Sequence, residues 1–141
     1  MHLKTILRRV HPIPGFVYRD ATIVSSRAGP TVHVEVRPRR GAKATCGGCG
    51  VKRPGYDTLA PRTFSFVPLW GMAVFFIYAS RRVDCRRCGV VAEMVPWATG
   101  KSPTTHAFAW FLASWAKVPS WKETARRFGT SWDIVFRAVE Q

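Results

Sequence analysis

Apolar and polar residues alternate with a period of two over much of the first hundred positions. The pattern runs from Phe16 to Val24 and again from Thr31 to Arg37, and Gly29-Pro30 lies between the two segments as a turn. Such alternation is typical of half-buried strands, so the two segments predict a β-hairpin. Three further strands are predicted at Thr63 to Leu69, Met72 to Asp84 and Val90 to Val95.

From Ser102 onward the apolar positions follow a helical period instead. Phe108, Leu112 and Trp115 recur at helical spacing, and Ser102-Pro103 has the cap and first-turn residues of a helix start. We expect this first helix to end near Lys117. The sequence thus predicts an α+β protein, with a β-rich region at 1–98 and a three-helix unit at 102–141.

The second and third helices are predicted from caps. Ser120 to Glu123 is a capping box, Gly129 ends the second helix, and Thr130-Ser131 caps the third. Ala125, Gly129 and Val135 have the spacing of a helix-turn-helix, in which the third helix enters the major groove. A helical hairpin without a role in DNA binding has the same pattern and remains an alternative.

Candidate DNA contacts follow from this interpretation. On the predicted recognition helix they are Ser131, Trp132, Asp133, Phe136 and Arg137, and on the helix before it they are Lys122, Arg126 and Arg127. Asp133 has a second interpretation, because it lies three residues after Thr130 and could complete a cap there.

The net charge favours a polyanionic partner. The chain has 22 Lys and Arg against 8 Asp and Glu, a formal charge of +14. Most of the basic residues are Arg, which binds phosphate oxygens and guanine edges through two donors at once, so nucleic acid is favoured over a membrane surface. Candidate phosphate contacts outside the helices are Arg37, Arg39, Arg40 and Lys43. Surface charge that serves solubility alone is the alternative.

All four cysteines lie in two matching CxxCG sequences, the first knuckle at 46–50 and the second knuckle at 85–89. The two sulfurs of a CxxC turn can converge on one metal ion, and the glycine that follows allows a tight turn beneath it. Cys46, Cys49, Cys85 and Cys88 therefore predict one structural Zn²⁺ per chain, with no ligand position left open.

Other interpretations of the cysteines remain. Two disulfides are disfavoured, because no segment is predicted to export the chain or insert it into a membrane, and a reducing cytoplasm follows. Paired CxxCG knuckles also hold iron in rubredoxin-like electron carriers, although the charge of +14 suits a polyanion better. An RNA-binding or protein-docking zinc ribbon is a further alternative.

The remaining histidines and tryptophans are expected to be structural. The histidines, His2, His11, His33 and His106, are scattered along the chain and predict no ligand cluster. Trp110, Trp115 and Trp121 occupy helix faces and are expected to lie in the core, whereas Trp132 is open to either core packing or base stacking.

Nearly the whole chain resembles the N-terminal region of the ISL-three insertion-sequence family of DDE-type transposases. The matching motifs are Gly15–Tyr18, Val34–Arg39, both knuckles, Gly55–Asp57, Phe66–Gly71, Arg81–Cys85, Val95–Trp97, Ser120–Glu123 and Ser131–Asp133. The resemblance implies that the four cysteines hold zinc. It also implies that the helix-turn-helix binds double-stranded DNA at the transposon's terminal inverted repeats, in the nucleoid of a bacterial cytoplasm.

The resemblance also implies what these residues do not do. In the family a DDE catalytic domain follows, in which three acidic residues hold divalent metal for strand cleavage and transfer. The chain ends at Gln141, before such a domain, so we expect it to be no enzyme by itself. Any homo-oligomer is expected to form through regions that are not in this chain.

Overall fold

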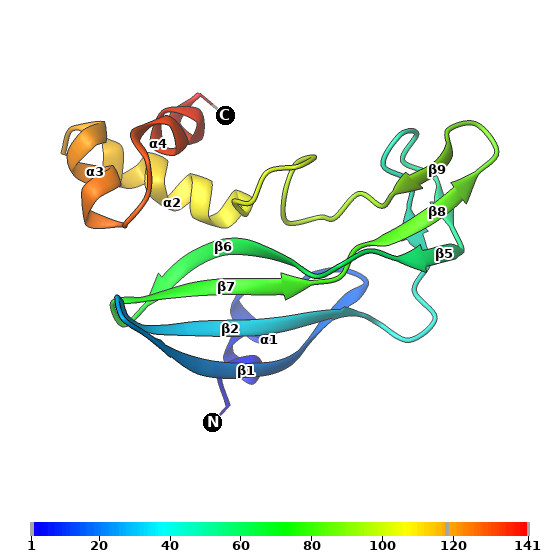
Figure 1. The fold of residues 1–141 in the computed structure, drawn as a ribbon, viewed down its shortest axis with the longest axis horizontal. Coiled ribbons are helices and arrows are strands. Elements are labelled where there is room, and N and C mark those ends of the chain that lie inside the picture. Colours follow the sequence, from blue (N-terminus) through cyan, green and yellow to red (C-terminus); the bar gives the residue numbers. More distant parts are fainter. Residues whose placement is uncertain (1, 118, 141) are drawn as a thin grey trace.

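Strands dominate the chain up to Ala92, and helices form its C-terminal part (Figure 1). The computed structural model describes residues 2–117 and 119–140. In chain order the elements are α1 (Leu3–Val10), β1 (Phe16–Ser26), β2 (Gly29–Pro38), β3 (Ala44–Thr45), β4 (Lys52–Arg53), β5 (Gly55–Thr58), β6 (Arg62–Leu69), β7 (Met72–Tyr78), β8 (Arg81–Cys85), β9 (Gly89–Ala92), α2 (His106–Ala116), α3 (Trp121–Arg127) and α4 (Trp132–Val139). The predicted α+β class is confirmed.

The largest sheet has the strand order β1-β2-β7-β6. The predicted hairpin of β1 and β2 is confirmed, and β2 then pairs in parallel with β7, with Val34 opposite Phe76. Alternate residues of each strand face the core, among them Val32, Val34 and Phe76, which are fully buried. The period-two pattern of the sequence is therefore the burial pattern of this sheet.

Two segments outside the strands cover the inner face of this sheet. Helix α1, which the sequence did not predict, contributes Leu7, and the segment after β9 contributes Val95 and Trp97. The Trp97 ring packs edge-on against Phe16 and Tyr78 at 4.9 and 5.0 Å between ring centroids. Residues far apart in the chain thus complete one core.

A second, smaller β-region holds the knuckles, and its strands differ from the prediction. The expected strand from Met72 to Asp84 is two strands in different sheets, because β7 ends at Tyr78 and β8 begins at Arg81. The strand expected to reach Val95 ends at Ala92, because the next residues turn toward the first knuckle, where Met94 N–H donates to the Thr45 carbonyl at 2.8 Å.

The three C-terminal helices pack on one another around Leu112, Ala125 and Val135. The predicted caps of α3 and α4 are confirmed, since the Ser120 and Ser131 hydroxyls accept from backbone N–H groups. Gly129 has φ +60°, the left-handed conformation expected between these helices. Among the described residues, no helix has the length and apolar character needed to cross a bilayer.

The predicted start of the first of these helices was wrong. Helix α2 is capped by Thr105 and not by Ser102. Residues 103–105 are extended and lie along the edge of β6, where Ser65 N–H donates to Pro103 O at 2.7 Å and Thr105 N–H donates to Ser65 O at 3.0 Å. These bonds hold the last residues before α2 against the main sheet.

Candidate metal centre and nucleic-acid interface

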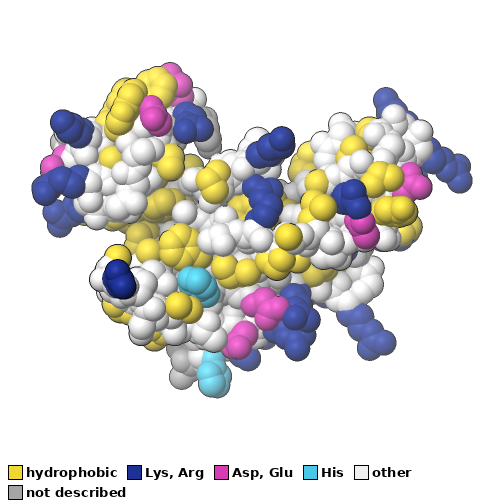
Figure 2. Space-filling view, in the orientation of Figure 1, with side chains coloured by type: hydrophobic (Ala, Val, Ile, Leu, Met, Phe, Trp, Pro, Cys, Tyr) yellow, Lys and Arg dark blue, Asp and Glu magenta, His cyan; other side chains and the backbone are white. Residues whose placement is uncertain are grey.

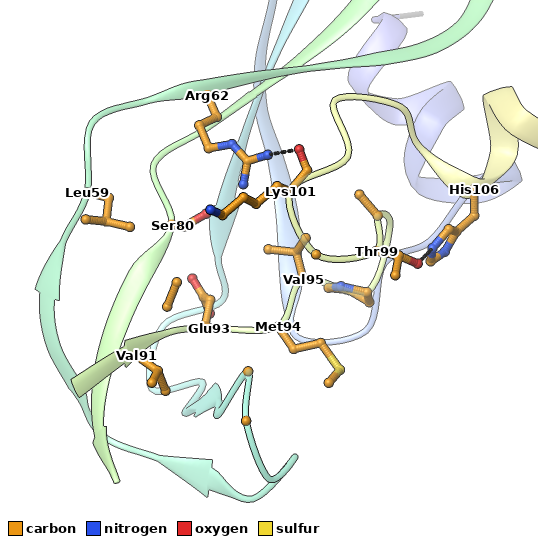
Figure 3. Close-up of a pocket in the computed structure, with 16 residues that line it drawn as sticks. Leu59, Arg62, Ser80, Val91, Glu93, Met94, Val95, Thr99, Lys101 and His106 are labelled. Carbon is orange, nitrogen blue, oxygen red and sulfur yellow. Dashed lines mark hydrogen bonds between the residues drawn. The ribbon is translucent and has the colours of Figure 1, made fainter. Parts of the chain in front are cut away.

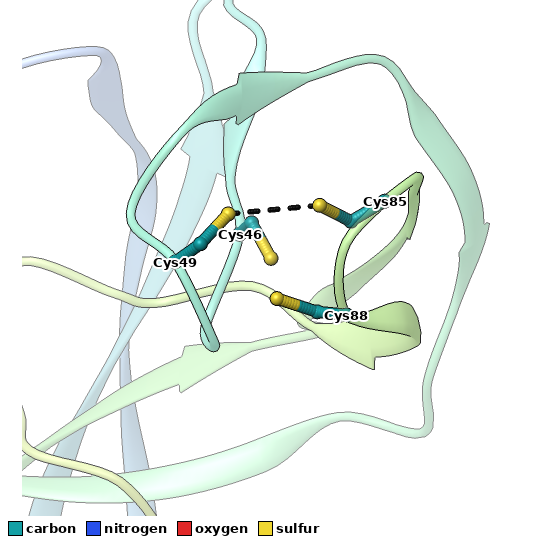
Figure 4. A group of neighbouring side chains, drawn as sticks. All are labelled: Cys46, Cys49, Cys85 and Cys88. Carbon is teal, nitrogen blue, oxygen red and sulfur yellow. Dashed lines mark hydrogen bonds between the residues drawn. The ribbon is translucent and has the colours of Figure 1, made fainter.

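The four cysteine sulfurs meet at one point between the two knuckles (Figure 4). All four Sγ atoms lie within 4.8 Å of one another, and those of Cys49 and Cys85 are 3.6 Å apart. Tetrahedral zinc with Zn–S bonds of about 2.3 Å would place its sulfurs about 3.8 Å apart. The predicted convergence of the cysteines is confirmed, and the arrangement fits a metal ion that is bound by four thiolate ligands.

Glycines let the two knuckles approach this closely. Gly50 and Gly89, each directly after a CxxC turn, have φ +73° and +74°, where a β-carbon would be strained. Between the cysteines, a β-carbon on Gly48 would lie 2.7 Å from Cys88 Sγ, and one on Gly47 would lie 2.4 Å from the Ala92 carbonyl oxygen. The small residues are therefore part of the site's geometry.

The backbone around the sulfurs favours thiolates. Hydrogen bonds from the N–H groups of Arg87 and Cys88 lower the pKa of Cys85 to about 6, and those of Cys49 and Gly48 lower the pKa of Cys46. Burial and the neighbouring sulfurs raise the pKa of Cys88 to about 12. Because four thiolates repel one another at this distance, a bound cation is what would allow all four to ionise together.

A buried ion pair joins the start of β8 to the residues after β9, and the Tyr78 hydroxyl at the end of β7 links it to the main sheet. Sequence reasoning missed it. The Glu93 carboxylate accepts from the Arg81 guanidinium at 2.8 Å and from the Arg81 backbone N–H at 2.7 Å, and the Tyr78 hydroxyl donates to it as well. Arg81 also donates to the Ala42 carbonyl at 2.6 Å. The sequence has many arginines and does not show which of them pairs with Glu93.

The positive charge is unevenly divided along the chain. Residues 1–101 contain 17 of the 22 Lys and Arg but 5 of the 8 Asp and Glu, a formal charge of +12, which leaves +2 for residues 102–141. Arg39, Arg40 and Lys43 are exposed in the stretch before the first knuckle. Figure 2 shows Lys and Arg side chains projecting from the knuckle region and from the helices. Arg37 is exposed too, but it is paired with Glu35 at 2.6 Å.

Several of the predicted contacts on the helices already have partners within the protein. Ser131 caps α4, the Arg137 Nε–H donates to the Asp133 carbonyl at 3.2 Å, and Arg126 pairs with Glu123 at 2.6 Å. Asp133 lies in the first turn of α4, where a negative charge suits the helix dipole. The remaining candidates are Lys122, Arg127 and Trp132, which are exposed, and Phe136, which is half-buried.

The expectation that three tryptophans lie in the core was wrong. Trp110 is 73% exposed, because α2 packs through Phe108 and Leu112 on another side of the helix. Trp115 and Trp121 are also exposed, although the Trp115 ring contacts Phe128 at 5.3 Å between centroids. A helix with apolar residues on every side gives no pattern from which its buried face can be read.

An open hollow lies between the metal-binding region and the start of the helices (Figure 3). Its volume is about 1000 Å³, and Val91, Met94 and Val95 line it together with Arg62 and Lys101. Arg62 donates to the Lys101 carbonyl at 2.9 Å, which ties one wall to β6.

Comparison with known proteins relates the chain to transposases. It is 34% identical over 94 residues to the transposase for insertion sequence element IS1557 from two strains of Mycobacterium tuberculosis. The aligned segment covers 63% of this chain and 21% of each relative, so the chain spans about a fifth of the length of the curated relatives it matches. No protein-family model and no solved structure matches it. The similarity supports a transposase-related, insertion-sequence origin.

Proposed function

We propose that these residues form the DNA-binding part of an insertion-sequence transposase of the ISL-three kind, and that they bind the element's terminal inverted repeats as double-stranded DNA. The sequence relation to a transposase carries this proposal. The formal charge of +14 supports it, because DNA is a polyanion.

The contacts divide between two regions in this proposal. Helices α3 and α4 act as a helix-turn-helix with α4 in the major groove, where Arg137 can reach a guanine edge. The β-rich residues 1–101, with a formal charge of +12, supply most of the phosphate contacts through side chains such as Arg39, Arg40 and Lys43. Phosphate contacts fix position and register, and base contacts select the sequence.

The four cysteines bind structural zinc in this proposal. Zinc would hold the two knuckles together. The small apolar cluster of Ala44, Val83 and the buried cysteines stabilises this region only weakly by itself. The proposal gives these residues a role in binding and assigns them no part in strand cleavage.

Metal analysis tests the zinc assignment. Purified protein should contain about one zinc per chain, and Cys85→Ser should lose the metal and unfold the knuckle region, since three thiolates leave the tetrahedron incomplete. Arg86→Ala, a neighbour with an exposed side chain, is the matched control and should keep its zinc. Iron in the purified protein, or a folded chain without metal, would contradict the assignment.

Competition binding tests the DNA assignment. A labelled duplex that carries the terminal repeat should be displaced by unlabelled repeat at lower concentration than by scrambled duplex or by structured RNA of equal length. Preference for the RNA would favour an RNA-binding protein and reject this proposal. Equal displacement by repeat and scrambled duplex would reject sequence-specific recognition.

A further inference from the structure

Three aromatic side chains form an exposed cluster on α3 and α4. The Trp121 and Phe136 rings are 5.2 Å apart and the Trp132 and Phe136 rings are 6.4 Å apart, measured between centroids. Trp132 is 56% exposed and Trp121 is 39% exposed. We name Trp121, Trp132 and Phe136 the aromatic cluster. Figure 2 shows hydrophobic side chains beside charged ones on the surface of this helical region.

The aromatic cluster packs on itself and contributes little to the core of the helices. That core consists of residues such as Leu112, Ala125 and Val135, with Phe111 and Phe128 at its margin, and none of the three aromatic rings belongs to it. Leaving two indoles in water costs free energy that burial would recover, so packing does not explain their position.

The chemistry of the cluster and of its neighbours points to nucleobases. Lys122 and Arg137, which follow Trp121 and Phe136 in sequence, are exposed cations, and the whole chain is strongly positive. Exposed aromatic rings on helices that also carry exposed cations suit a ligand that has flat faces and a phosphate backbone. In an intact duplex the faces of the bases are covered by their neighbours, and they become accessible where pairing is lost.

We propose that the aromatic cluster stacks on unpaired bases at a locally opened stretch of DNA, while Lys122, an exposed cation on α3, contacts the flanking backbone. The proposal rests on the proposed DNA-binding function and specifies the form of DNA that this surface binds.

Two probes of one arbitrary sequence test this, a perfect 24-base-pair duplex and the same duplex with a central three-base bulge. Fluorescence anisotropy at one fixed salt concentration should give about tenfold tighter binding of the full chain to the bulged probe, in line with the contribution of one stacked base. Trp132→Ala should bring the ratio of the two affinities, bulged probe over perfect duplex, close to one.

Trp110→Ala is the matched control, because Trp110 is an exposed tryptophan on α2 outside the cluster. It should bind both probes like the unaltered chain, and Trp132→Phe should retain much of the preference. With 2-aminopurine in the bulge, the unaltered chain should quench the fluorescence by stacking and Trp132→Ala should not. Circular dichroism checks that each variant stays folded.

The outcomes separate this proposal from the one on which it rests. Binding to neither probe, together with no binding to the terminal-repeat duplex, would reject the DNA-binding function itself. Equal binding to both probes, or equal effects of Trp132→Ala and Trp110→Ala, would reject base stacking and leave the duplex assignment intact.

Discussion

At the scale of single residues, the metal centre depends on backbone positions where no side chain fits. Gly47 and Gly48 let the first knuckle lie against β9 and the second knuckle, and the Gly47 N–H donates to the Ala92 carbonyl at 3.2 Å. The sequence showed that glycines follow each CxxC pair, but not that the residues between Cys46 and Cys49 face a neighbouring strand. That constraint comes from a strand more than forty residues away.

Gly47→Ala should therefore weaken the metal centre. Its β-carbon would lie 2.4 Å from a backbone oxygen, so the first knuckle must move, at a cost of about 1 to 3 kcal/mol for such overpacking. Loss of metal to a chelator should become faster, and thermal unfolding followed by circular dichroism should begin earlier. Gly55→Ala is the control, since its nearest new contact is Arg81 Cδ at 3.7 Å. Equal behaviour of both variants would contradict the close-packing argument.

At the scale of elements, the Arg81–Glu93 pair holds the start of β8 to the residues after β9. The Glu93 side chain is fully buried and the Arg81 side chain is 15% exposed, so both groups have lost most of their water. A comparable pair, Arg82 with Asp57, lies on the surface between β8 and β5. The two arginines are neighbours in sequence and their ion pairs differ in burial, which makes them a natural comparison.

Glu93→Ala should destabilise the protein far more than Asp57→Ala. Removing Glu93 leaves a largely buried guanidinium without its counter-ion, a change that typically costs about 3 to 5 kcal/mol. Removing Asp57 should have little effect, because water replaces it around Arg82. Urea unfolding monitored by tryptophan fluorescence measures both. A small effect of Glu93→Ala would show that water reaches Arg81 once the carboxylate is gone.

In the helical unit, a variant of a buried residue and a variant of an exposed residue should have different effects on folding and on DNA binding. Val135 is fully buried beside Ala125, so Val135→Asp places an unpaired charge in the core and should unfold the three helices, with DNA binding lost as a consequence. Arg137 is exposed, so Arg137→Ala should keep the fold and reduce preference for the terminal repeat by about 1 to 3 kcal/mol. Circular dichroism and competition binding distinguish the two. A folded Val135→Asp would contradict the packing.

Local patterns predicted the elements that local chemistry determines. The β1–β2 hairpin, the serine caps of α3 and α4 and the meeting of the four cysteines follow from residues close together in sequence or from matched motifs. The errors lie where a distant partner decides. Pairing of residues 103–105 with β6 delays α2, and the contacts of Arg81 divide one predicted strand into β7 and β8.

At the scale of the whole molecule, the division of charge separates two kinds of contact. Residues 1–101 carry a formal charge of +12 and the helical unit +2, and binding of a divalent metal by four thiolates would lower the total by about 2. If the proposed function holds, recognition by α4 and electrostatic attraction by the β-rich region should therefore be separable. Changes in α4 should alter sequence specificity, and changes in the β-rich region should alter the overall affinity for DNA.

Binding to duplex DNA should weaken steeply with salt. If about five phosphates are neutralised, the logarithm of the affinity should fall against the logarithm of the salt concentration with a slope of about −4 or steeper. Arg39→Ala with Arg40→Ala should make the slope shallower by up to about 2 and weaken binding to all sequences alike.

The control for this measurement is Asp57→Ala with Arg82→Ala, which removes a paired anion and cation outside the candidate contacts and leaves the net charge unchanged. It should leave the slope as it is. A slope near −1 for the unaltered chain would argue against an extended basic contact surface.

The two edges of the main sheet have a consequence for how copies of the protein behave in solution. Residues 103–105 pair with the β6 edge at Ser65, whereas β1 is the outer strand on the other side, with Ile23 and Val24 exposed there. Exposed apolar edge strands tend to pair with one another, and a break in register between Tyr18 and Asp20 opposes such pairing along β1. Like charge opposes it as well, and that opposition weakens as salt rises. The conditions that release DNA should therefore also promote aggregation through β1.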